Sequence, residues 1–365
     1  MRKLASIKKI VDIKPIDGAD KICAYQVDGW WVVDSVDKYN VGEAVVYLEI
    51  DSWVPATLAP FLSKGKEPNT FNGVPGERLK TIKLKGQLSQ GLLLPIEVCW
   101  EKVELAKFNL FDWQSDWNVD QVVGLDCTEA LGIQKWEPPV PACLSGEIKG
   151  EFPSFIEKTF QVRVQSLGKE LAEWNGKKLK WQVEEKLDGT SATFYIYNYA
   201  FGVCSRNLEL AENYNNTYWK IAKVNRLEEK LQEYYKNVLP GSRRGRNIAI
   251  QGEIIGEGIN GNHYGIHGQR LHVFDIYDID NQEYFLPSER NVFCKKNDLM
   301  QVPILQINKS LIGNTIEEIV AMADGASVLA DELGNSPCRE GLVLKSMHGY
   351  ESFKVISNRF LMTGK

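Results

Sequence analysis

The chain has 365 residues, of which 44% are hydrophobic and 25% charged, so it can build the cores of about two domains. Its formal net charge of −5 argues against a surface covered throughout with nucleic-acid-binding charge, although a local basic groove is compatible with it. No run of about eighteen apolar residues is present, and no long apolar segment follows the charged N-terminal stretch. We therefore expect neither a membrane span nor a signal peptide.

The seven cysteines form no C-x-x-C pair. We expect mostly buried, reduced thiols in an intracellular, cytoplasmic protein, and the sequence leaves a nuclear or viral origin open. His263, His267 and His272 lie close together in "HYGIHGQRLH", but without paired cysteines a zinc site is not expected there.

Residues 1–95 show the pattern of a small β-barrel. Strand-like segments at 30–36 and 43–50 flank the turn "DKYNVG", and residues 78–86 alternate between apolar and basic side chains. In that last stretch, Ile82 and Leu84 would face one side of a strand, and Lys83 and Lys85 the other. Short strands joined by Gly- and Asp-rich turns favour a barrel.

Residues 96–137 are acidic and rich in tryptophan, and the sequence assigns them no function. The proline-rich stretch 135–155 can continue neither a helix nor a central strand, so we expect the domain boundary there. We divide the chain into an N-terminal barrel domain with its acidic extension (1–135), a linker (136–160) and a C-terminal domain (161–365).

The C-terminal domain has the pattern of an α+β fold built around antiparallel sheet. Helices are predicted at 164–176, 216–241 and 315–333, and the second has apolar residues at helical spacing up to "PG" (240–241). Strands are predicted at 178–186, 190–199, 247–255, 270–279, 340–346 and 351–357.

The stretch "EEKLDGTS" (184–191) places Lys186 between two acids and an Asp-Gly turn. Taken alone, it favours a hairpin turn with a solvent-facing lysine, because Asp-Gly is a common two-residue turn. Five further motifs follow in order and change this interpretation: "SRN" (205–207), "QGEIIGEG" (251–258), "HVFDIY" (272–277), "EGLVLK" (340–345) and "SFKVIS" (352–357).

This ordered set resembles the motifs of the covalent nucleotidyltransferases, which include ATP-dependent DNA and RNA ligases and mRNA capping guanylyltransferases. The resemblance covers about residues 160–357 and implies an antiparallel-sheet, ATP-grasp-like ligase domain in which Lys186 attacks ATP and carries AMP. A lysine amine attacks phosphorus only when it is deprotonated, and its reference pKa is about 10.4. We therefore expect the site to favour the neutral amine through burial, nearby cations or a bound metal.

The resemblance implies a metal site made of carboxylates. Asp188 and Glu340 would hold waters on a catalytic Mg²⁺, for which Mn²⁺ could substitute, and Glu253 would contact that metal shell or the ribose. Glu253 and Glu340 lie on apolar strands, where an unpaired carboxylate is costly, so a functional role is favoured for both.

The remaining motif residues would bind the nucleotide. Phe274 would stack on adenine, and Arg206 would bind ribose or the incoming phosphate; the alternatives are a core side chain and a surface cation. Lys345 and Lys354 would neutralise phosphate charge, and Glu185 would adjoin the nucleotide. Related ligases often carry Lys-x-Lys in the last motif, whereas this chain has "KVI" (354–356), so one cation is missing or replaced.

The order of the domains narrows the resemblance. DNA ligases and capping enzymes typically place an OB-fold domain after the last motif, where only about eight residues remain here. An OB-like β-barrel in front of the catalytic domain resembles the Deinococcus-type RNA ligases. That likeness extends to "LGIQKWEPP" (131–139) and "FPSFIEKTFQVRVQSL" (152–167).

The narrower resemblance implies a monomeric RNA ligase that joins 3′-OH and 5′-phosphate ends, most simply in a nicked duplex, through lysyl-AMP and RNA-adenylate. RNA would contact the barrel, with Lys83 and Lys85 as candidates, and the "RRGR" loop (243–246) could add charge. Arg163 and Gln165 would approach the 5′-phosphate strand. A DNA nick ligase, a guanylyltransferase and a non-catalytic RNA-binding scaffold remain as alternatives.

The sequence "GEGING" (256–261) fits G-x-G-x-x-G after a predicted strand. A dinucleotide-binding fingerprint also needs a helix directly after it, and "NHYGIHGQR" has no helical period. We therefore do not expect a Rossmann site.

Overall fold

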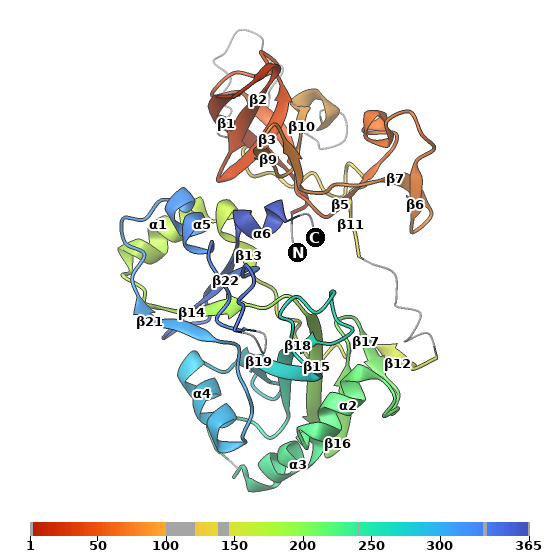
Figure 1. Ribbon diagram of the computed structural model, residues 1–365, viewed down its shortest axis with the longest axis vertical. Coiled ribbons are helices and arrows are strands. Elements are labelled where there is room, and N and C mark those ends of the chain that lie inside the picture. Colours follow the sequence, from red (N-terminus) through yellow and green to blue (C-terminus); the bar gives the residue numbers. More distant parts are fainter. Residues whose placement is uncertain (1–2, 100–120, 138–145, 240, 331–333, 364–365) are drawn as a thin grey trace. The chain divides into compact units, whose positions relative to one another are not determined.

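The computed structural model describes residues 3–99, 121–137, 146–239, 241–330 and 334–363 (Figure 1). Its contacts divide the chain into two compact units, Met1–Pro139 and Val140–Lys365. Trp100, Trp113, Trp117 and Cys143 lie outside the described residues. Part of the predicted linker belongs to the second unit, because residues 148–151 form a strand there and Ile156 packs in a core cluster.

The N-terminal unit is built from antiparallel strands. A five-stranded sheet has the order β10-β4-β1-β2-β3, a four-stranded sheet the order β11-β5-β7-β6, and β8 and β9 form a hairpin. The bounds are β1 Ala5–Ile16, β2 Ala19–Val27, β3 Trp30–Ser35, β4 Ala44–Leu48, β5 Ser52–Pro55, β6 Asn69–Phe71, β7 Val74–Arg78, β8 Ile82–Leu84, β9 Gln87–Ser89, β10 Leu92–Pro95 and β11 Gln134–Lys135, with short 3-10 helices at Pro60–Ser63 and Ile96–Cys99.

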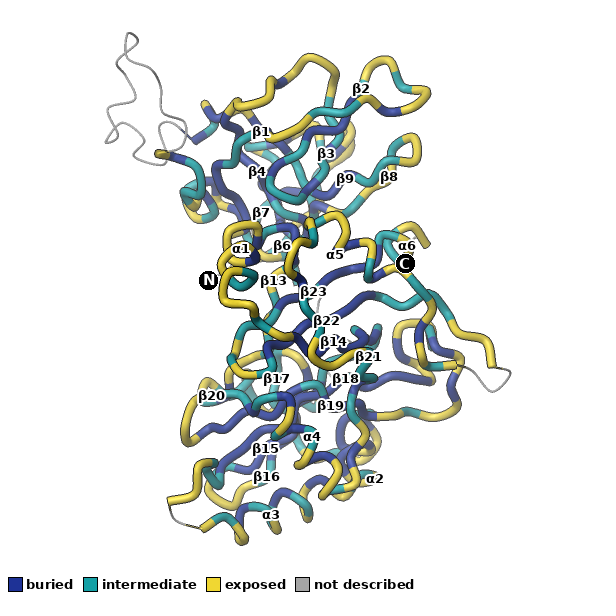
Figure 2. The backbone as a smooth tube through the Cα atoms, turned by 90° about the vertical axis from the view of Figure 1, so that its left-hand side faces the viewer, coloured by how far each residue is buried: buried dark blue, intermediate teal, exposed yellow. Residues whose placement is uncertain are grey.

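Strand β4 shows why this sheet curls around a core. Its five residues are all buried: Val46 and Leu48 pack in one apolar cluster, and Val45 and Tyr47 in another. A strand with apolar side chains on both faces needs cover on both sides. The curled sheet and its neighbours provide that cover, as the buried stretches in Figure 2 show.

The predicted alternating strand at 78–86 is wrong in part. Strand β7 ends at Arg78, and β8 contains only Ile82–Leu84, with Ile82 51% exposed. Among the described strands, β8 and β9 pair with each other alone, while Ser89 of β9 is buried and accepts a hydrogen bond from Val33 of β3. Its turn at Lys85 and Gly86 has positive φ at both residues, as tight two-residue hairpin turns require.

Two sheets form the C-terminal unit. A seven-stranded sheet has the order β12-β17-β16-β15-β18-β19-β20, and a five-stranded sheet the order β13-β23-β22-β14-β21. The strands are β12 Ile148–Glu151, β13 Val162–Arg163, β14 Trp181–Lys186, β15 Thr190–Tyr197, β16 Ala200–Cys204, β17 Leu208–Leu210, β18 Ile248–Gly256, β19 Gln269–Asp278, β20 Glu283–Tyr284, β21 Ile304–Lys309, β22 Gly341–Ser346 and β23 Ser352–Ile356. All described pairs in these sheets are antiparallel except β13 with β23.

Helices cover the outer faces of these sheets (Figure 1). Their bounds are α1 Gly168–Gly176, α2 Thr217–Val224, α3 Leu227–Asn237, α4 Pro287–Lys296, α5 Ile316–Met322 and α6 Asn358–Met362, with a 3-10 turn at Val164–Ser166. Trp219 and Leu231 of α2 and α3 pack with Phe194 of β15 in the largest apolar cluster. Leu171 of α1 and Ile319 of α5 pack with the five-stranded sheet.

Two predicted helices are shorter than the sequence indicates. The helix predicted at 216–241 is two helices, because Arg226 adopts a left-handed φ of 53° between them. The helix predicted at 315–333 ends at Met322, and Gly325 follows with a φ of 153°. The apolar spacing that suggested one long helix at 216–241 continues across Arg226, so periodicity could not locate that break.

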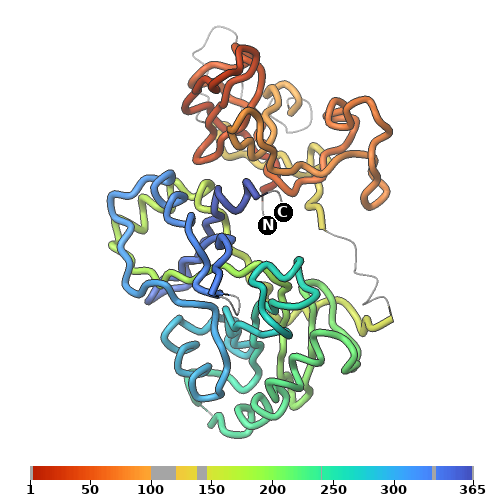
Figure 3. The backbone as a smooth tube through the Cα atoms, viewed as in Figure 1, coloured from red at the N-terminus to blue at the C-terminus, as the bar shows by residue number. Residues whose placement is uncertain are grey.

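Strands β14 and β15 do not form the hairpin that the Asp-Gly turn favours. Strand β14 pairs with β21 and β22, whereas β15 pairs with β16 and β18, so residues 187–189 carry the chain from one sheet to the other. Figure 3 shows the C-terminal strands lying beside β14 despite their distance in sequence. Gly189 is required at this crossing, because a Cβ there would lie 2.3 Å from the carbonyl oxygen of Ile254.

Candidate active site

Lys186 is the last residue of β14 and lies opposite Gly341, the first residue of β22. Its Nζ lies 2.7 Å from Oε2 of Glu340, and the lysine side chain is 28% exposed. On its other side, Gly341 allows β22 to approach β23, because a Cβ there would lie 2.1 Å from the carbonyl oxygen of Val355. The strand pairing thus brings together a lysine and a carboxylate that are 154 positions apart in the sequence.

Three carboxylates surround this lysine. Burial lowers the pKa of Lys186, but the charges of Glu340, Glu253 and Asp188 outweigh it, so the pKa is raised. This is the opposite of the neutral amine that the sequence argument expects. Burial also raises the pKa of Glu253 to about 7; the charge of Lys186 opposes this rise and that of Glu340 adds to it.

The oxygen donors fit a hard divalent cation such as Mg²⁺ or Mn²⁺. In the described part of the chain, however, no three His, Cys, Asp or Glu side chains are close enough to form a preformed metal cage. Such a cation would therefore be held partly by water and by phosphate, as is usual for Mg²⁺. Burial is the main cause of the raised pKa of Glu253, and the charges of Glu340 and Asp188 add to it, so a cation close to these carboxylates would favour their charged forms.

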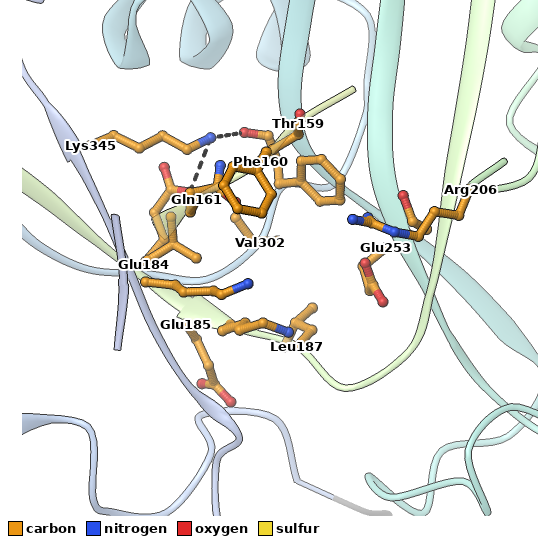
Figure 4. Close-up of a pocket in the computed structure, with 15 residues that line it drawn as sticks. Thr159, Phe160, Gln161, Glu184, Glu185, Leu187, Arg206, Glu253, Val302 and Lys345 are labelled. Atoms are coloured by element: carbon orange, nitrogen blue, oxygen red, sulfur yellow. Dashed lines mark hydrogen bonds and ion pairs between the residues drawn. The ribbon is translucent and has the colours of Figure 1, made fainter. Parts of the chain in front are cut away.

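A cavity of about 220 Å³ opens beside Lys186, between the two sheets (Figure 4). Phe274, Val302 and Val343 supply apolar surface, while Arg206 extends toward Glu253. The full lining is Thr159, Phe160, Gln161, Glu184, Glu185, Lys186, Leu187, Ser191, Arg206, Glu253, Phe274, Val302, Val343, Lys345 and Lys354. A mixture of apolar walls and a few convergent charged groups is typical of a ligand-binding pocket.

A second charged cluster forms the inner side of the cavity. Nζ of Lys345 donates to Oδ1 of Asp275 at 2.5 Å and to the carbonyl oxygen of Phe274, and it lies 3.7 Å from Oε2 of Glu184. Nη2 of Arg290 lies 2.5 Å from Oε1 of Glu184. Burial raises the pKa of Glu184, but Arg290 and Lys345 outweigh it, so the pKa is lowered and the carboxylate stays charged.

Comparison with known proteins identifies the chain. A model of the RNA ligase family matches residues 179–357, and an OB-fold domain model matches residues 4–96. A solved structure described as Naegleria gruberi RNA ligase with PPi is 43% identical, covers 100% of this chain and 99% of its own, and has a TM-score of 0.81. The chain belongs to the RNA ligase family.

Two further Naegleria gruberi RNA ligase structures, both of variants, are similar. One, with AMP and Mn, is 43% identical over 99% of each chain with a TM-score of 0.82; the other, with ATP and Mn, is 42% identical over 99% of each chain with a TM-score of 0.80. A comparison with curated proteins gives no match. These findings confirm two predictions: an RNA ligase, and an α+β fold in which an OB-fold domain precedes the ligase domain.

The fold of the chain brings most of the predicted site residues together. Lys186, Arg206, Glu253, Phe274, Lys345 and Lys354 all line the cavity, and Glu340 contacts Lys186. Asp188 lies in the crossing after the lysine, where its Oδ1 accepts a hydrogen bond from Asn260. Lys354 lies near the ring of Phe160, with Nζ 5.7 Å from the ring centroid.

Glu185 differs from the other predicted residues. It adjoins the cavity, but its carboxylate accepts a hydrogen bond from the Val328 N–H at 2.9 Å and points away from Lys345 in Figure 4. Alternate residues of a strand face opposite sides, so Glu184 shares the face of Lys186 and Glu185 does not. The sequence prediction missed Glu184, although this alternation could have identified it.

The segment 159–161 was also missed. Thr159 Oγ1 contacts Oε1 of Gln251 and lies 3.1 Å from Oδ2 of Asp275, while Phe160 is 46% exposed at the cavity. The segment precedes Lys186 by more than twenty residues and lies within the stretch 152–167 to which the resemblance extends, but the sequence prediction marked none of its three residues as a site residue. The contacts of Thr159 with Gln251 and Asp275, and the pairing of β13 with β23 directly after the segment, bring it to the cavity.

Other candidate residues have mainly structural partners. Arg244 of the "RRGR" loop is 11% exposed and forms ion pairs with Glu283 and Glu289. Gln165 is buried at 2% exposure, which argues against contact with an RNA strand, whereas Arg163 lies beside Lys354 through the β13–β23 pairing. Lys83 and Lys85 are exposed.

The histidines and cysteines show no metal-binding arrangement in the described residues. His263 bonds to the carbonyl oxygen of Cys338, His272 bonds to that of Gln301, and His267 pairs with Glu257. Each of the six described cysteines has a free thiol. None of the helices in the described ranges is long and apolar enough to cross a membrane.

Proposed function

We propose that this RNA ligase uses ATP and a divalent metal ion to join an RNA 3′-OH end to a 5′-phosphate end, through lysyl-AMP on Lys186 and an RNA-adenylate. The observation that carries the proposal is the position of Lys186 at the crossing between two sheets, with Nζ 2.7 Å from Glu340 and a cavity beside it. A nicked duplex is the proposed substrate, and the enzyme would act as a monomer.

In the first step, Nζ of Lys186 loses its proton, attacks the α-phosphorus of ATP and displaces pyrophosphate. The neighbouring carboxylates raise the lysine pKa, so their charge must be offset before the amine can act as a nucleophile. A divalent ion near Asp188, Glu253 and Glu340 would supply that offset and would also neutralise phosphate charge. The crossing after β14 fixes the position of the lysine, and phosphoryl transfer depends largely on such positioning.

The cavity provides separate surfaces for the base and the phosphates. Phe274 would stack on adenine, with Val343 nearby on the β22 wall. Arg206 would bind ribose or the incoming phosphate, and Lys345 and Lys354 would face phosphate charge. Lys345 already donates to Asp275, so its contribution includes holding the cavity wall as well as its charge.

The two later steps involve RNA. The 5′-phosphate of RNA attacks the phosphorus of lysyl-AMP, which restores the lysine and forms RNA-adenylate. The 3′-OH then attacks the activated 5′-phosphate, so that a phosphodiester bond forms and AMP leaves. The OB-fold domain would contribute RNA contacts, because OB folds bind single strands through phosphate contacts and base stacking.

The test is covalent labelling with α-labelled ATP and Mg²⁺ on a denaturing gel. We expect label on the wild type and on Lys180→Ala, a control at an exposed lysine of the same region, and none on Lys186→Ala. The sample is treated with pyrophosphate first, because protein that already carries AMP would not take up label. Label on Lys186→Ala at the wild-type level would contradict the proposal.

The alternatives are separated by their substrates. Labelling by GTP instead of ATP would favour a guanylyltransferase. Nicked duplexes that differ only in an RNA or a DNA 3′-OH strand distinguish an RNA ligase from a DNA nick ligase, and equal sealing of both would contradict RNA specificity. Absence of label with both nucleotides would favour a non-catalytic RNA-binding scaffold.

A further inference from the structure

The glycine-rich loop that follows β18 is ordered by its own contacts. Gly256, Gly258 and Gly261 all have left-handed φ values, of 122°, 77° and 70°. Ile259 is 8% exposed in the core of the seven-stranded sheet, and Tyr264 is 1% exposed in a neighbouring cluster. The "GEGING" pattern therefore forms a fixed loop anchored by two buried side chains.

This loop holds the residues directly after Lys186. Nδ2 of Asn260 donates to Oδ1 of Asp188 at 2.8 Å and to the carbonyl oxygen of Gly189 at 2.9 Å. The hydroxyl oxygen of Tyr264 accepts the N–H of Asp188 at 2.7 Å. Three hydrogen bonds from one loop thus fix the backbone and the carboxylate of Asp188.

The same loop also contacts the chain that leads to Glu340. His263 Nε2 lies 2.7 Å from the carbonyl oxygen of Cys338, two residues before Glu340. The loop at 260–264 therefore bonds to both sides of the pair formed by Lys186 and Glu340. Among the described strand pairs, none joins the loop at 260–264 to residues 187–189 or to Cys338, and hydrogen bonds of the loop's side chains make the connection.

We propose that Asn260 is a positioning residue for adenylylation: its amide fixes the Asp188 carboxylate by one oxygen and so presents the other oxygen to a divalent cation. The inference rests on the proposed function, in which Asp188 faces the metal. Among the described residues no protein hydrogen bond to Oδ2 of Asp188 is found, whereas Oδ1 is engaged. A carboxylate held in one rotamer loses less conformational entropy when it binds a cation.

The backbone at Asn260 determines which substitutions are informative. Its φ of 45° is left-handed, a conformation that Asn, Asp and Gly tolerate and that is strained for alanine. Asn260→Gly removes the amide and keeps the backbone, and Asn260→Asp keeps the shape but removes both N–H donors. Glu257→Gln is the matched control, because Glu257 lies on the same loop, is 57% exposed and pairs only with His267 through its side chain.

The first measurement is Mn²⁺ binding in the presence of ATP, followed by electron paramagnetic resonance, in a Lys186→Ala background that cannot turn over. We expect Asn260→Gly to weaken Mn²⁺ binding about tenfold and Asn260→Asp to weaken it at least as much, because a hydrogen bond to a charged group is lost. Glu257→Gln should bind as the parent does. In the Lys186-containing protein, the same variants should need about tenfold more Mg²⁺ for half-maximal lysine labelling.

Thermal unfolding of each variant separates positioning from a structural role. Unchanged Mn²⁺ affinity in both Asn260 variants, with or without a fall in melting temperature, would overturn the proposal. Failure of the proposed function would appear differently, as wild-type protein that gives no label or a Lys186→Ala protein that still does. Asn260→Asp provides the second variant if Asn260→Gly folds poorly.

Discussion

Two clusters of charged side chains adjoin strand β14 and differ in charge balance. Around Glu184, two cations face two buried acids, and the four side chains are no more than 9% exposed. Around Lys186, one lysine faces three carboxylates, its side chain is 28% exposed, and the pKa of Glu253 is raised to about 7. The buried cluster balances its charges within the protein, whereas the carboxylates around Lys186 would be further neutralised by a divalent cation.

The largest effect is expected from breaking the balanced cluster. Arg290→Met should lower the free energy of unfolding by about 3–5 kcal/mol, because Glu184 would stay buried without its main cationic partner. Urea unfolding measures this difference. The control Arg243→Met, at a side chain that is 66% exposed and 3.3 Å from Glu289, should change stability by less than about 1 kcal/mol. Equal effects of the two substitutions would contradict the comparison.

In the cluster around Lys186, removing a charge is expected to raise the free energy of unfolding, by less than Arg290→Met lowers it. Glu253 keeps its proton up to about pH 7 in the folded chain but loses it near its ordinary value of 4.5 when unfolded, so its contribution to stability falls as the pH rises between these values. Glu253→Gln cannot titrate. Without divalent metal, its stability relative to the wild type should therefore rise by about 3 kcal/mol between pH 4.5 and pH 8.

Urea unfolding at the two pH values, with a chelator present, tests this prediction. Glu257→Gln serves as the control, because Glu257 is exposed and lies outside the cluster. A stability difference between Glu253→Gln and the wild type that is the same at both pH values would show that folding does not raise the pKa of Glu253.

The smallest effect is expected on RNA sealing, from two exposed lysines of the N-terminal unit. Lys83→Ala/Lys85→Ala should lower sealing of nicked RNA a few-fold and make it less dependent on salt, because phosphate contacts are lost. Lysine labelling by ATP should not change. The control Lys21→Ala/Lys66→Ala removes the same charge at other exposed positions. Equal loss of sealing in both double variants would indicate a general charge effect rather than a contact surface.

The sequence predicted the fold class, the OB-like barrel and the residues of the ordered motifs. The resemblance carried by the ordered motifs predicted Lys186, Glu253 and Glu340 as site residues, and strand pairing brings Glu340 within 2.7 Å of the lysine. The α+β class followed from alternating patterns, and the OB-like barrel from short strands and turns. The fold class and the barrel depend on patterns that are local in sequence, which hydrophobic periodicity records, whereas the site residues depended on the motifs.

Partners that are distant in sequence could not be predicted in this way. Arg290 lies 106 positions from Glu184, and nothing in "PSERNVF" marks it as a buried ion-pair partner. The Asp-Gly turn favours a hairpin, and only the choice of β22 and β18 as neighbours excludes one. The raised pKa of Lys186 likewise depends on carboxylates from three separate segments.

Because the chain changes sheet after Lys186, both sheets of the C-terminal unit contribute walls to the cavity. Lys345 and Lys354 stand on one hydrogen-bonded sheet, and Glu253 and Phe274 on the other. Main-chain hydrogen bonds link the two at residues 300–303, where Val273 N donates to Met300 O and Glu185 N to Pro303 O. A nucleotide that contacts both walls would add to these links, so its binding would hold the two sheets together.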